Sequence, residues 1–443
     1  MQTILKVMPT ALTIAGVDSG GGAGVAADIK TFAALGVHGT CVIASLTAQN
    51  TRGVVNFQDI PVSFIEEQFN AVVSDIKINC AKTGMLSSPD IVRTVAGLLK
   101  DQRFPLVIDP VMAAEAGGEL LKDDAVSVLI EELMPLSTVI TPNVAEAERI
   151  SGLKITDLKD AKKAAKKIHD MGAIAVIVTG GHLGGTDVLY DGEVTYIEGT
   201  LVKGGTHGSG CTHSAAITAE LAKGTSLLLA AQRAKKFVER AILASVAIGA
   251  GSAPVNQIGP MLEDAQRYHV LRNVEEAVEI IEKNMAPELI PEVGCNIAMA
   301  VSNASSTQDV AAVQGRIVRL RGAPHAVGCA DFGASSHTAR IVLTAMRHDS
   351  SMRAAMNIRY SKEALAACEN IGLKLSSFSR EDEPEDVATM EWGVNEVIQR
   401  EGMVPSVIYD TGGVGKEAMI RLLGKDAVEV AGIALQISSA LMK

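Results

Sequence analysis

The stretch Lys203-Gly204-Gly205-Thr206-His207-Gly208-Ser209-Gly210-Cys211-Thr212-His213-Ser214-Ala215-Ala216 is a glycine-rich loop that runs directly into an alanine-rich segment. Its glycines let the backbone turn tightly and approach a ligand closely. We expect a helix to begin near Cys211 or Thr212, so that its unpaired N–H groups and positive dipole end face the loop. This arrangement suits an anion such as a phosphate. Cys211 is a potential nucleophile or base at the same turn, and its position predicts a lowered thiol pKa.

Outward from this loop, apolar segments alternate with helical ones through the first half of the chain. Strands are predicted at 11–17, 42–46, 106–108, 139–140 and 173–178, and helices at 25–35 and 161–171. Such alternation is typical of a mostly parallel sheet covered by helices on both faces. Polar or glycine-rich stretches follow the strands, among them Asp18-Ser19-Gly20-Gly21-Gly22-Ala23-Gly24 and Thr47-Ala48-Gln49-Asn50-Thr51. These are the positions at which open α/β sheets bind ligands.

Length and composition limit the kind of protein. A chain of 443 residues exceeds one ordinary core and predicts two domains, and 47% hydrophobic with 21% charged residues indicates a globular protein. Aromatic residues make up 3% and the net charge is −11, so nucleic-acid binding is not expected. The six cysteines form no C-x-x-C pair, which predicts a reduced, cytoplasmic protein. No run of 18 uncharged apolar residues occurs, so no membrane span is expected.

Two carboxylates, Asp109 and Glu146, follow neighbouring predicted strands. Together they are suited to hold Mg²⁺, directly or through water, as phosphoryl transfer requires. Spacing alone leaves a second interpretation open, because an Asp after a strand is often a turn or cap residue. Cys211 equally has the alternative of a small buried cysteine, and His207 and His213 that of hydrogen-bonding residues in the loop.

Several blocks of the first half occur together and in order. They are Ala15-Gly16-x-Asp18, Gly21-Gly22-Ala23-Gly24, Ala27-Asp28-Ile29-Lys30-Thr31-Phe32, Thr47-Ala48-Gln49-Asn50-Thr51, Lys82-x-Gly84-Met85-Leu86, Asp109-Pro110-Val111-Met112, Thr141-Pro142-Asn143-x-x-Glu146 and Thr206-His207-Gly208-Ser209-Gly210-Cys211-Thr212. With these blocks, about residues 8–260 resemble the hydroxymethylpyrimidine/phosphomethylpyrimidine kinases of thiamine synthesis, which have a ribokinase-like three-layer α/β/α fold.

The resemblance implies ATP-dependent phosphorylation in two steps, first of 4-amino-5-hydroxymethyl-2-methylpyrimidine and then of its monophosphate. It implies a pyrimidine pocket, an anion hole and an Mg²⁺–phosphate region. The pyrimidine pocket matches Asp28, Gln49 and Met85. The anion hole matches Gly208, Ser209, Gly210 and Cys211, and the Mg²⁺–phosphate region matches Asp109 and Glu146. The chain departs from the family at Thr179, where many members have lysine, and at Ser19-Gly20, where Pro-Ser is usual.

Cys211 stands where other ribokinase-like kinases carry an Asp base. A base should matter more for the alcohol acceptor than for the phosphate acceptor, which is already anionic. A Cys211→Ala variant is therefore expected to slow the first phosphorylation more than the second. Equal losses would indicate that Cys211 shapes the anion hole instead.

The second half carries a different set of basic residues. Arg316, Arg319 and Arg321 are predicted on one strand, with Arg316 on the opposite face from the other two. The turn Gly333-Ala334-Ser335-Ser336-His337, with Arg340 nearby, favours a phosphate site. The run Thr411-Gly412-Gly413-Val414-Gly415-Lys416 suggests a second anion loop.

About residues 275–443 resemble the thiamine-phosphate synthase domain that is fused to the pyrimidine kinase in archaea and some bacteria. The resemblance implies that the pyrimidine diphosphate is joined to thiazole phosphate with release of pyrophosphate. Arg316 and His337 are the predicted catalytic residues, assisted by Arg340. The arginine would stabilise the departing diphosphate, and the histidine would donate a hydrogen bond or proton to it.

We therefore predict an α/β protein with a kinase domain at 1–262, a junction helix at 263–284 and a smaller α/β synthase domain at 285–443. Its expected ligands are the aminopyrimidine, thiazole phosphate, ATP and Mg²⁺. Ribokinase-like kinases often form dimers, which makes a homodimer an open expectation. Two alternatives remain. The C-terminal domain would be a non-catalytic sensor of thiamine phosphate, or the kinase would be a broader vitamin kinase of the pyridoxal type.

Overall fold

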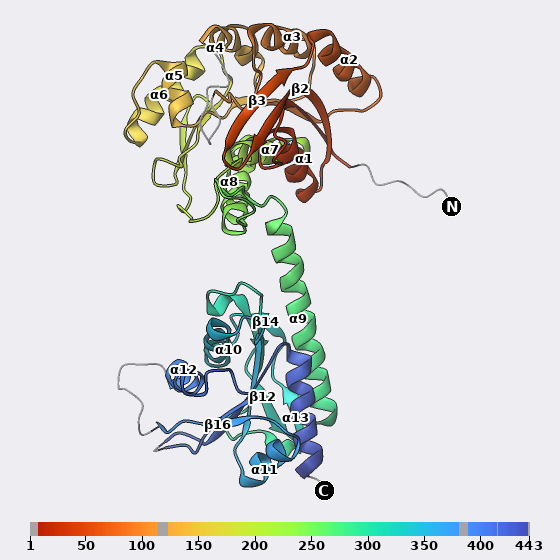
Figure 1. The fold of residues 1–443 in the computed structure, drawn as a ribbon, viewed down its shortest axis with the longest axis vertical. Helices are drawn as coiled ribbons and strands as arrows, with labels where there is room; N and C mark the ends of the chain where they lie inside the picture. Colours follow the sequence, from red (N-terminus) through yellow and green to blue (C-terminus); the bar gives the residue numbers. More distant parts are fainter. Residues whose placement is uncertain (1–7, 113–122, 381–388, 414, 442–443) are drawn as a thin grey trace, which may run out of the picture. The chain divides into compact units, whose positions relative to one another are not determined.

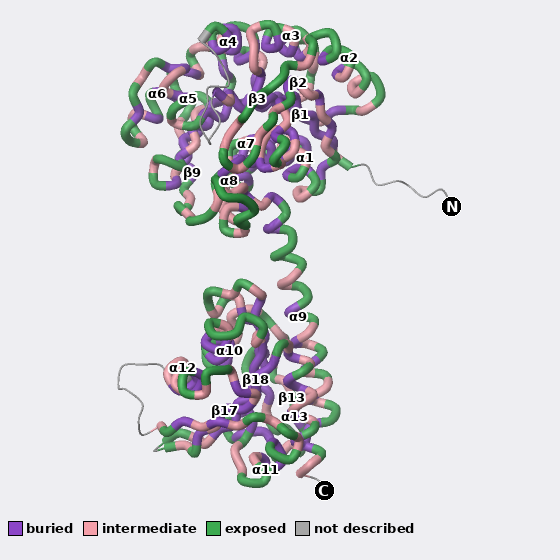
Figure 2. Tube along the Cα trace, viewed as in Figure 1, coloured by how far each residue is buried: buried purple, intermediate pink, exposed green. Residues whose placement is uncertain are grey.

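The computed structural model of the chain divides into two compact units, Met1–Leu262 and Glu263–Lys443. It describes residues 8–112, 123–380, 389–413 and 415–441. Each unit is a sheet with helices on both faces, and the strands carry the most buried residues, drawn in purple in Figure 2. Val414, part of the predicted second anion loop, lies outside the described residues.

The first unit contains a nine-stranded sheet. In spatial order the strands are β3 (Gly53–Asp59), β2 (His38–Asn50), β1 (Thr10–Val17), β4 (Cys80–Thr83), β5 (Leu106–Ile108), β6 (Val139–Ile140), β7 (Val176–Val178), β8 (Asp187–Tyr190) and β9 (Val194–Ile197). The six strands from β2 to β7 are parallel, and β3, β8 and β9 join antiparallel at the edges.

Helices cover both faces of this sheet because alternate strand residues point to opposite sides. In β5, Leu106 and Ile108 enter one core and Val107 enters the other. The first core is closed by α2 (Val62–Val73), α3 (Pro89–Leu99), α4 (Asp123–Val128), α5 (Val144–Ser151) and α6 (Leu158–Asp170). The second is closed by α1 (Gly24–Ala34), α7 (Ser209–Ala222) and α8 (Leu227–Leu243). The predicted three-layer α/β/α architecture is confirmed (Figure 1).

The second unit is built on a seven-stranded sheet. Its spatial order is β14 (Ala330–Phe332), β11 (Val310–Val313), β10 (Ile297–Ala300), β15 (Ala354–Arg359), β18 (Met419–Gly424), β17 (Val407–Asp410) and β16 (Leu375–Ser377). The pairs are antiparallel except β16 with β17. A separate hairpin joins β12 (Ile317–Leu320) to β13 (Ala323–Ala326).

One face of this sheet packs against α9 (Gly259–Asn284), α11 (Lys362–Asn370) and α13 (Ala427–Leu441), and the other against α10 (Ser336–His348) and α12 (Thr389–Glu401). The helix α9 is no bare connector, because Val270, Val274, Ala277 and Ile281 are buried in the core of the second unit. Their spacing places them on one face of the helix.

Candidate active site

A cavity of about 590 Å³ lies in the first unit at the carboxyl ends of the parallel strands. Its wall includes residues of β1, β2 and β4 and of the loops that follow β5, β6 and β7. Of the residues predicted for the kinase, the cavity gathers Gln49, Met85, Asp109, Glu146, Gly208, Ser209, Gly210 and Cys211. Asp28 is the exception, because its side chain is fully buried and does not form part of the wall.

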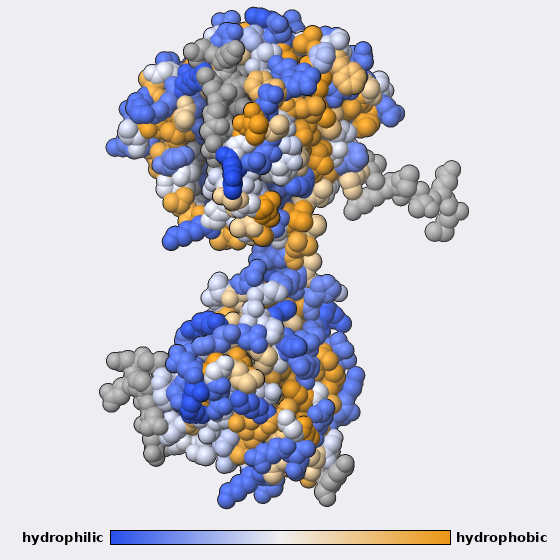
Figure 3. Space-filling model, viewed as in Figure 1, coloured by the Kyte–Doolittle hydropathy of each residue, from blue (hydrophilic) through white to orange (hydrophobic). Residues whose placement is uncertain are grey.

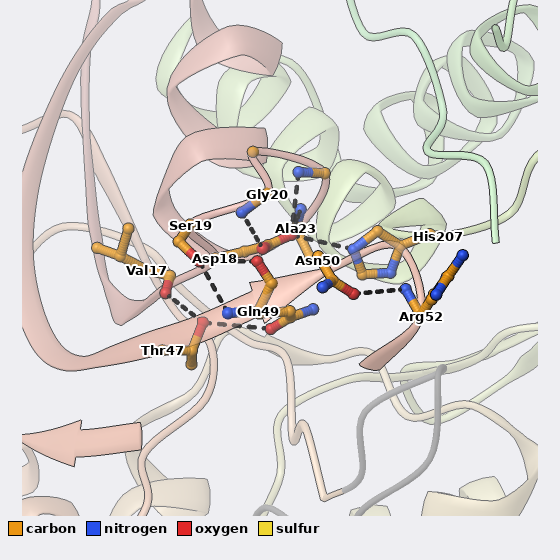
Figure 4. Close-up of polar contacts among 12 residues, drawn as sticks. Val17, Asp18, Ser19, Gly20, Ala23, Thr47, Gln49, Asn50, Arg52 and His207 are labelled. Atoms are coloured by element: carbon orange, nitrogen blue, oxygen red, sulfur yellow. Dashed lines mark hydrogen bonds and ion pairs between the residues drawn. The ribbon is translucent and has the colours of Figure 1, made fainter. Parts of the chain in front are cut away.

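The two glycine-rich loops of the sequence are joined by an Asp18–His207 contact (Figure 4). One carboxylate oxygen of Asp18 accepts from the backbone N–H of Gly22 and Ala23 at 3.0 and 2.9 Å, and it lies 3.0 Å from Nε2 of His207. Burial raises the pKa of Asp18, but the bonds from His207 and the backbone outweigh it, so the net pKa is lowered. The carboxylate therefore stays ionised and holds both loops at the cavity.

Glycine is required where these loops meet. Gly208 has φ +81°, and a Cβ there would lie 1.9 Å from the carbonyl oxygen of Gly22. A Cβ on Gly22 would in turn lie 2.4 Å from the ring of His207. Both contacts are far below van der Waals distance, so larger residues would push the loops apart.

The helix α7 begins at Ser209, slightly before the predicted start, with Gly208 as its N-cap. A glycine N-cap has no side chain to accept from the first-turn N–H groups. Ser209, Gly210 and Cys211 form this first turn and border the cavity. The positive end of the helix thus faces the space where a ligand would bind, which suits an anion.

Lys82 is a buried cation that the sequence analysis did not single out. It is fully buried in the cavity wall, and its Nζ lies 2.8 Å from Oδ1 of Asp28 and 3.9 Å from Oδ2 of Asp109. Burial alone would lower the pKa of Lys82, but the charges of Asp28 and Asp109 raise it above its ordinary value. Thr13 Oγ1 also donates to Asp28 at 2.6 Å. Asp28 therefore orients Lys82 from behind the wall.

The two predicted metal carboxylates lie near each other. Burial and the charge of Asp109 raise the pKa of Glu146 to about 8. Burial also raises the pKa of Asp109, against the charge of Lys82, and Ser214 Oγ donates to it at 2.8 Å. Glu146 forms a capping box with Asn143 at the start of α5, so its predicted alternative as a cap residue is confirmed. Two repelling carboxylates beside an anion cradle still suit Mg²⁺, which typically uses one or two carboxylates, substrate phosphates and water.

The expectation of a lowered thiol pKa at Cys211 is wrong. Burial, followed by the charge of Asp109, raises the pKa to about 12, although Lys82 and the Gly24 N–H act in the opposite direction. Proximity to a helix N-terminus does not compensate for a desolvated site with carboxylates nearby. The free thiol is therefore protonated at neutral pH.

The departure at Thr179 lies on the same cavity. The backbone N–H of Gly180 donates to Oδ1 of Asp187 at 2.7 Å, and the same oxygen lies 2.7 Å from Nζ of Lys235 in α8. Lys235 and Thr179 both line the cavity. A lysine is thus present at this wall, and it comes from α8 rather than from position 179.

The second unit gathers basic residues around His337, at the start of α10. Partial desolvation of the ring, followed by the charges of Arg421, Arg316, Arg380 and Arg340, lowers the pKa of His337 to about 4. His337 is exposed, so a ligand can reach it. A bound anion would counteract the arginine charges and so raise the pKa of His337 again. The predicted Arg316, His337 and Arg340 are therefore brought together, and Arg380 and Arg421 join them.

The predicted arginine strand is wrong in its extent. The strand β12 covers Ile317–Leu320, so Arg319 lies in it, whereas Arg316 and Arg321 flank it with φ +78° and +51°. Left-handed backbone is unusual for a residue with a Cβ. At Arg316 it turns the chain after Gly315, and the guanidinium donates to the carbonyl of Val293.

Comparisons with known proteins agree with this division. The family Phosphomethylpyrimidine kinase matches residues 18–256, and the family Thiamine-phosphate synthase ThiN matches residues 273–436. The bifunctional thiamine biosynthesis protein ThiDN of Methanocaldococcus jannaschii is 36% identical over 422 residues, which cover 95% of this chain and 96% of that protein. The hydroxymethylpyrimidine/phosphomethylpyrimidine kinase of Synechococcus elongatus is 44% identical over 260 residues, 57% of this chain and 99% of the relative.

Among solved structures, an ADP complex of Bacillus subtilis pyridoxal kinase is 40% identical, with a TM-score of 0.54, over 58% of this chain and 100% of that one. The ribokinase-like fold of the first unit is therefore shown. Across the described ranges, no helix combines the length and apolar character needed to cross a membrane. Within the same ranges, no group of three or more His, Cys, Asp or Glu side chains is arranged to hold a metal ion.

Proposed function

The chain belongs to the phosphomethylpyrimidine kinase family and continues into a ThiN thiamine-phosphate synthase domain, and from that premise we propose which residues carry its two activities. It is a thiamine biosynthesis enzyme with an ATP-dependent hydroxymethylpyrimidine and phosphomethylpyrimidine kinase followed by a thiamine-phosphate synthase. The observation that carries the kinase assignment to particular residues is the single cavity where a helix N-terminus, a buried lysine and two carboxylates meet.

In the kinase, the pyrimidine binds beside Gln49 and Met85. The Gln49 backbone is fixed by Ser19, whose Oγ lies 2.8 Å from both its N and its O, so the altered loop residue positions the pocket wall. The side-chain amide of Gln49 can pair with the aminopyrimidine edge, which presents both donors and acceptors. Met85 supplies a polarizable apolar contact for the ring. Direct pyrimidine contact by Asp28 stays a prediction, and its burial supports an indirect role through Lys82.

The transferred phosphoryl group is held by the backbone N–H groups of Ser209, Gly210 and Cys211. Phosphoryl transfer passes through a loose transition state, so positioning and charge neutralisation contribute most. Lys82 supplies a fixed positive charge at the same cavity. Cys211, with its raised thiol pKa, acts as a part of the anion hole rather than as a base.

Asp109 and Glu146 would hold Mg²⁺ together with the nucleotide phosphates, directly or through water. When bound, the ion would neutralise charge on the phosphates and bring the donor and acceptor oxygens into line. Ser214 fixes Asp109, and the capping box fixes Glu146, so both carboxylates are held in place without the ion.

In the synthase, Arg316 stabilises the departing diphosphate and His337 donates a hydrogen bond or proton to it. A thiazole nitrogen forms a bond to the pyrimidine methylene carbon as the C–O bond to the diphosphate breaks, and pyrophosphate leaves. Arg340 adds charge at the same place. Negative charge on the diphosphate counteracts the arginine charges and raises the pKa of His337, which equips it to hold a proton.

A coupled assay on the whole chain tests both assignments. Hydroxymethylpyrimidine, thiazole phosphate, ATP and Mg²⁺ should yield thiamine phosphate without another enzyme. Accumulation of pyrimidine diphosphate without thiamine phosphate would instead favour the sensor interpretation of the second unit.

A second candidate activity rests on the similarity to pyridoxal kinase. We propose that pyridoxal is at most a secondary substrate, because a relative that matches nearly the whole chain is a thiamine biosynthesis protein. The test is to divide kcat/KM for hydroxymethylpyrimidine by kcat/KM for pyridoxal. A quotient below one would make pyridoxal the main substrate and reverse our assignment.

A cytoplasmic location and a homodimer remain our predictions. Exposed apolar side chains on β2, β3 and the start of α2 support self-association, since large exposed apolar patches mark interaction sites. They are Leu46, Val55, Phe57 and Phe64, and Figure 3 shows apolar surface on this part of the first unit. Light scattering of the intact chain tests the dimer.

A further inference from the structure

The second unit contains a buried Arg–Asp–Arg group that neither the family matches nor the proposed catalytic residues account for. Asp410, at the end of β17, and Arg421, in β18, are completely buried, and their side chains meet at 2.6 Å. Arg380 holds the other side of the same carboxylate, with Nε 2.6 Å from Oδ1 and Nη2 3.1 Å from Oδ2. One carboxylate is thus shared by two guanidinium groups.

This group lies on the face of the sheet that α10 covers. Alternation along β17 and β18 places Asp410 with Ile408, and Arg421 with Leu423, and both apolar residues belong to the core that α10 and α12 close. Phe378, in the same core, lies under the Arg421 guanidinium at 5.2 Å from the ring centroid. His337 lies in the first turn of α10, and the charges of both Arg380 and Arg421 lower its pKa. The group and His337 therefore face one region.

Charge balance indicates that this region is built for an anion. Arg316, Arg340, Arg380 and Arg421 act on His337, and Asp410 compensates only part of their charge. Arg421 is completely buried and Arg380 nearly so, whereas Arg316 and Arg340 are exposed, so the single carboxylate offsets one of two charges that have lost most of their water. Because an unbalanced charge in such a place is costly, a further anionic partner would stabilise it. A ligand with two phosphates supplies that partner.

Arg380 is the member that can reach a ligand. Its side chain keeps 11% of its surface exposed, whereas Arg421 and Asp410 keep none. Asp410 occupies one edge of its guanidinium, through Nε and Nη2. Because a guanidinium has five N–H donors in a rigid fork, the other edge remains suited to a phosphate. Asp410 in turn is fixed by Arg421 and by the backbone N–H of Gly412 at 2.9 Å.

We propose that Arg380 binds the diphosphate of the substrate, and the pyrophosphate product, beside Arg316 and His337, and that Asp410 and Arg421 are positioning residues that act through it. This inference rests on the proposed synthase site. It assigns Gly412 a supporting role, because its backbone N–H donates to Asp410, and the neighbouring Gly413 pairs with Lys416.

The test is product inhibition of the synthase reaction by inorganic pyrophosphate, measured on the full chain with thiazole phosphate saturating. Arg380→Ala should raise the inhibition constant of pyrophosphate, and KM for the pyrimidine diphosphate, by about 10- to 100-fold, the usual effect of losing a charge-assisted hydrogen bond. KM for thiazole phosphate should change less than about threefold, and both kinase rates should stay unchanged. The matched control is Arg319→Ala, an exposed arginine of β12 that should alter none of these constants.

Two further variants separate positioning from simple loss of charge. Arg380→Lys keeps the charge but loses the fork, so its inhibition constant should lie between those of wild type and Arg380→Ala. Asp410→Asn should weaken pyrophosphate binding less than Arg380→Ala, and the double variant should be no worse than Arg380→Ala alone. A melting curve shows which variants fold. If Asp410→Asn does not fold, the comparison of Arg380→Ala with Arg380→Lys still tests whether Arg380 binds pyrophosphate.

An inhibition constant within twofold of wild type for Arg380→Ala would overturn the inference, as would an equal rise in both KM values. Arg316→Ala, measured in parallel, keeps the two claims apart. If Arg316→Ala abolishes synthesis while Arg380→Ala leaves pyrophosphate binding intact, only the inference about Arg380 fails. If Arg316→Ala remains fully active, the proposed synthase site itself is wrong.

Discussion

The two units hold phosphate groups by opposite means. The kinase cavity uses backbone N–H groups of α7 and one buried lysine that lies beside two carboxylates of the protein, Asp28 and Asp109. The synthase region uses guanidinium side chains that outnumber the one carboxylate bound to them. The first site is therefore formed before its ligand arrives, whereas the second relies on the ligand to complete its charge balance. Because both occur in one chain, each unit serves as the internal control for the other.

The largest expected effect is the loss of the buried kinase cation. Lys82→Met should lower kinase kcat/KM by about 10³-fold, because it removes a preorganised charge and leaves Asp28 and Asp109 unbalanced. Synthase kcat/KM on supplied pyrimidine diphosphate should stay within about twofold. Steady-state rates of both reactions on one preparation make the comparison. A parallel loss of both activities would show that the units are not independent.

Removing an arginine from the other unit should give the mirror result. Arg316→Ala is expected to lower synthase kcat by about 10²-fold, the typical cost of one lost transition-state contact. Neither kinase step should change. Initial rates of thiamine phosphate formation, with Arg319→Ala as the exposed control, provide the measurement.

The surplus of positive charge predicts a titration that depends on ligand. In the free protein the pKa of His337 is about 4, so the imidazole is neutral at pH 7. Bound pyrophosphate offsets the arginine charges, so the pKa should rise by more than about one unit and the ring should take up a proton. NMR titration of the His337 ring, with and without pyrophosphate, reports this directly. An unchanged pKa would mean that the anion binds elsewhere.

The smallest effect concerns Cys211. If its backbone N–H and shape matter rather than its thiol, Cys211→Ala should slow the first and second phosphorylations equally, by less than about tenfold. Separate rates on hydroxymethylpyrimidine and on its monophosphate distinguish the two roles. A selective loss of the first step would restore the base hypothesis.

Sequence patterns were sufficient to predict the features that depend only on residues close together in the chain. The glycine-rich loop and the polar residues after the strands were predicted as ligand-binding segments, and the structure places Thr206–Cys211 of that loop, with Thr47 and Gln49, at one cavity. Glycine spacing and strand ends encode these features directly, since they depend on backbone conformation at each position. Several sequence blocks in a fixed order also indicated the kinase family.

The electrostatic environment could not be predicted in the same way. Lys82 stands in a quoted block, but its importance comes from Asp28, which lies far away in sequence. The raised pKa of Cys211 likewise depends on burial and on Asp109. Arg380 and Arg421 belong to no glycine-rich turn, and only strand pairing brings Arg421 beside Asp410. The one available signal, a charged residue within an otherwise apolar strand segment, as at Lys82 and Arg421, was not used in the sequence analysis.

The helix α9 has a consequence for anyone who would split this enzyme into separate polypeptides. Val270, Val274, Ala277 and Ile281 on one face of the helix are buried in the second unit, although the synthase family match begins only within the helix, at residue 273. A gene fission at residue 285 would leave the part of the apolar core that α9 covers open to water, although α11 and α13 still cover the same sheet face, and the synthase fragment would be prone to aggregation. A functional fission should fall near residue 262, so a stand-alone relative of this synthase needs its own equivalent of α9 as a leading segment.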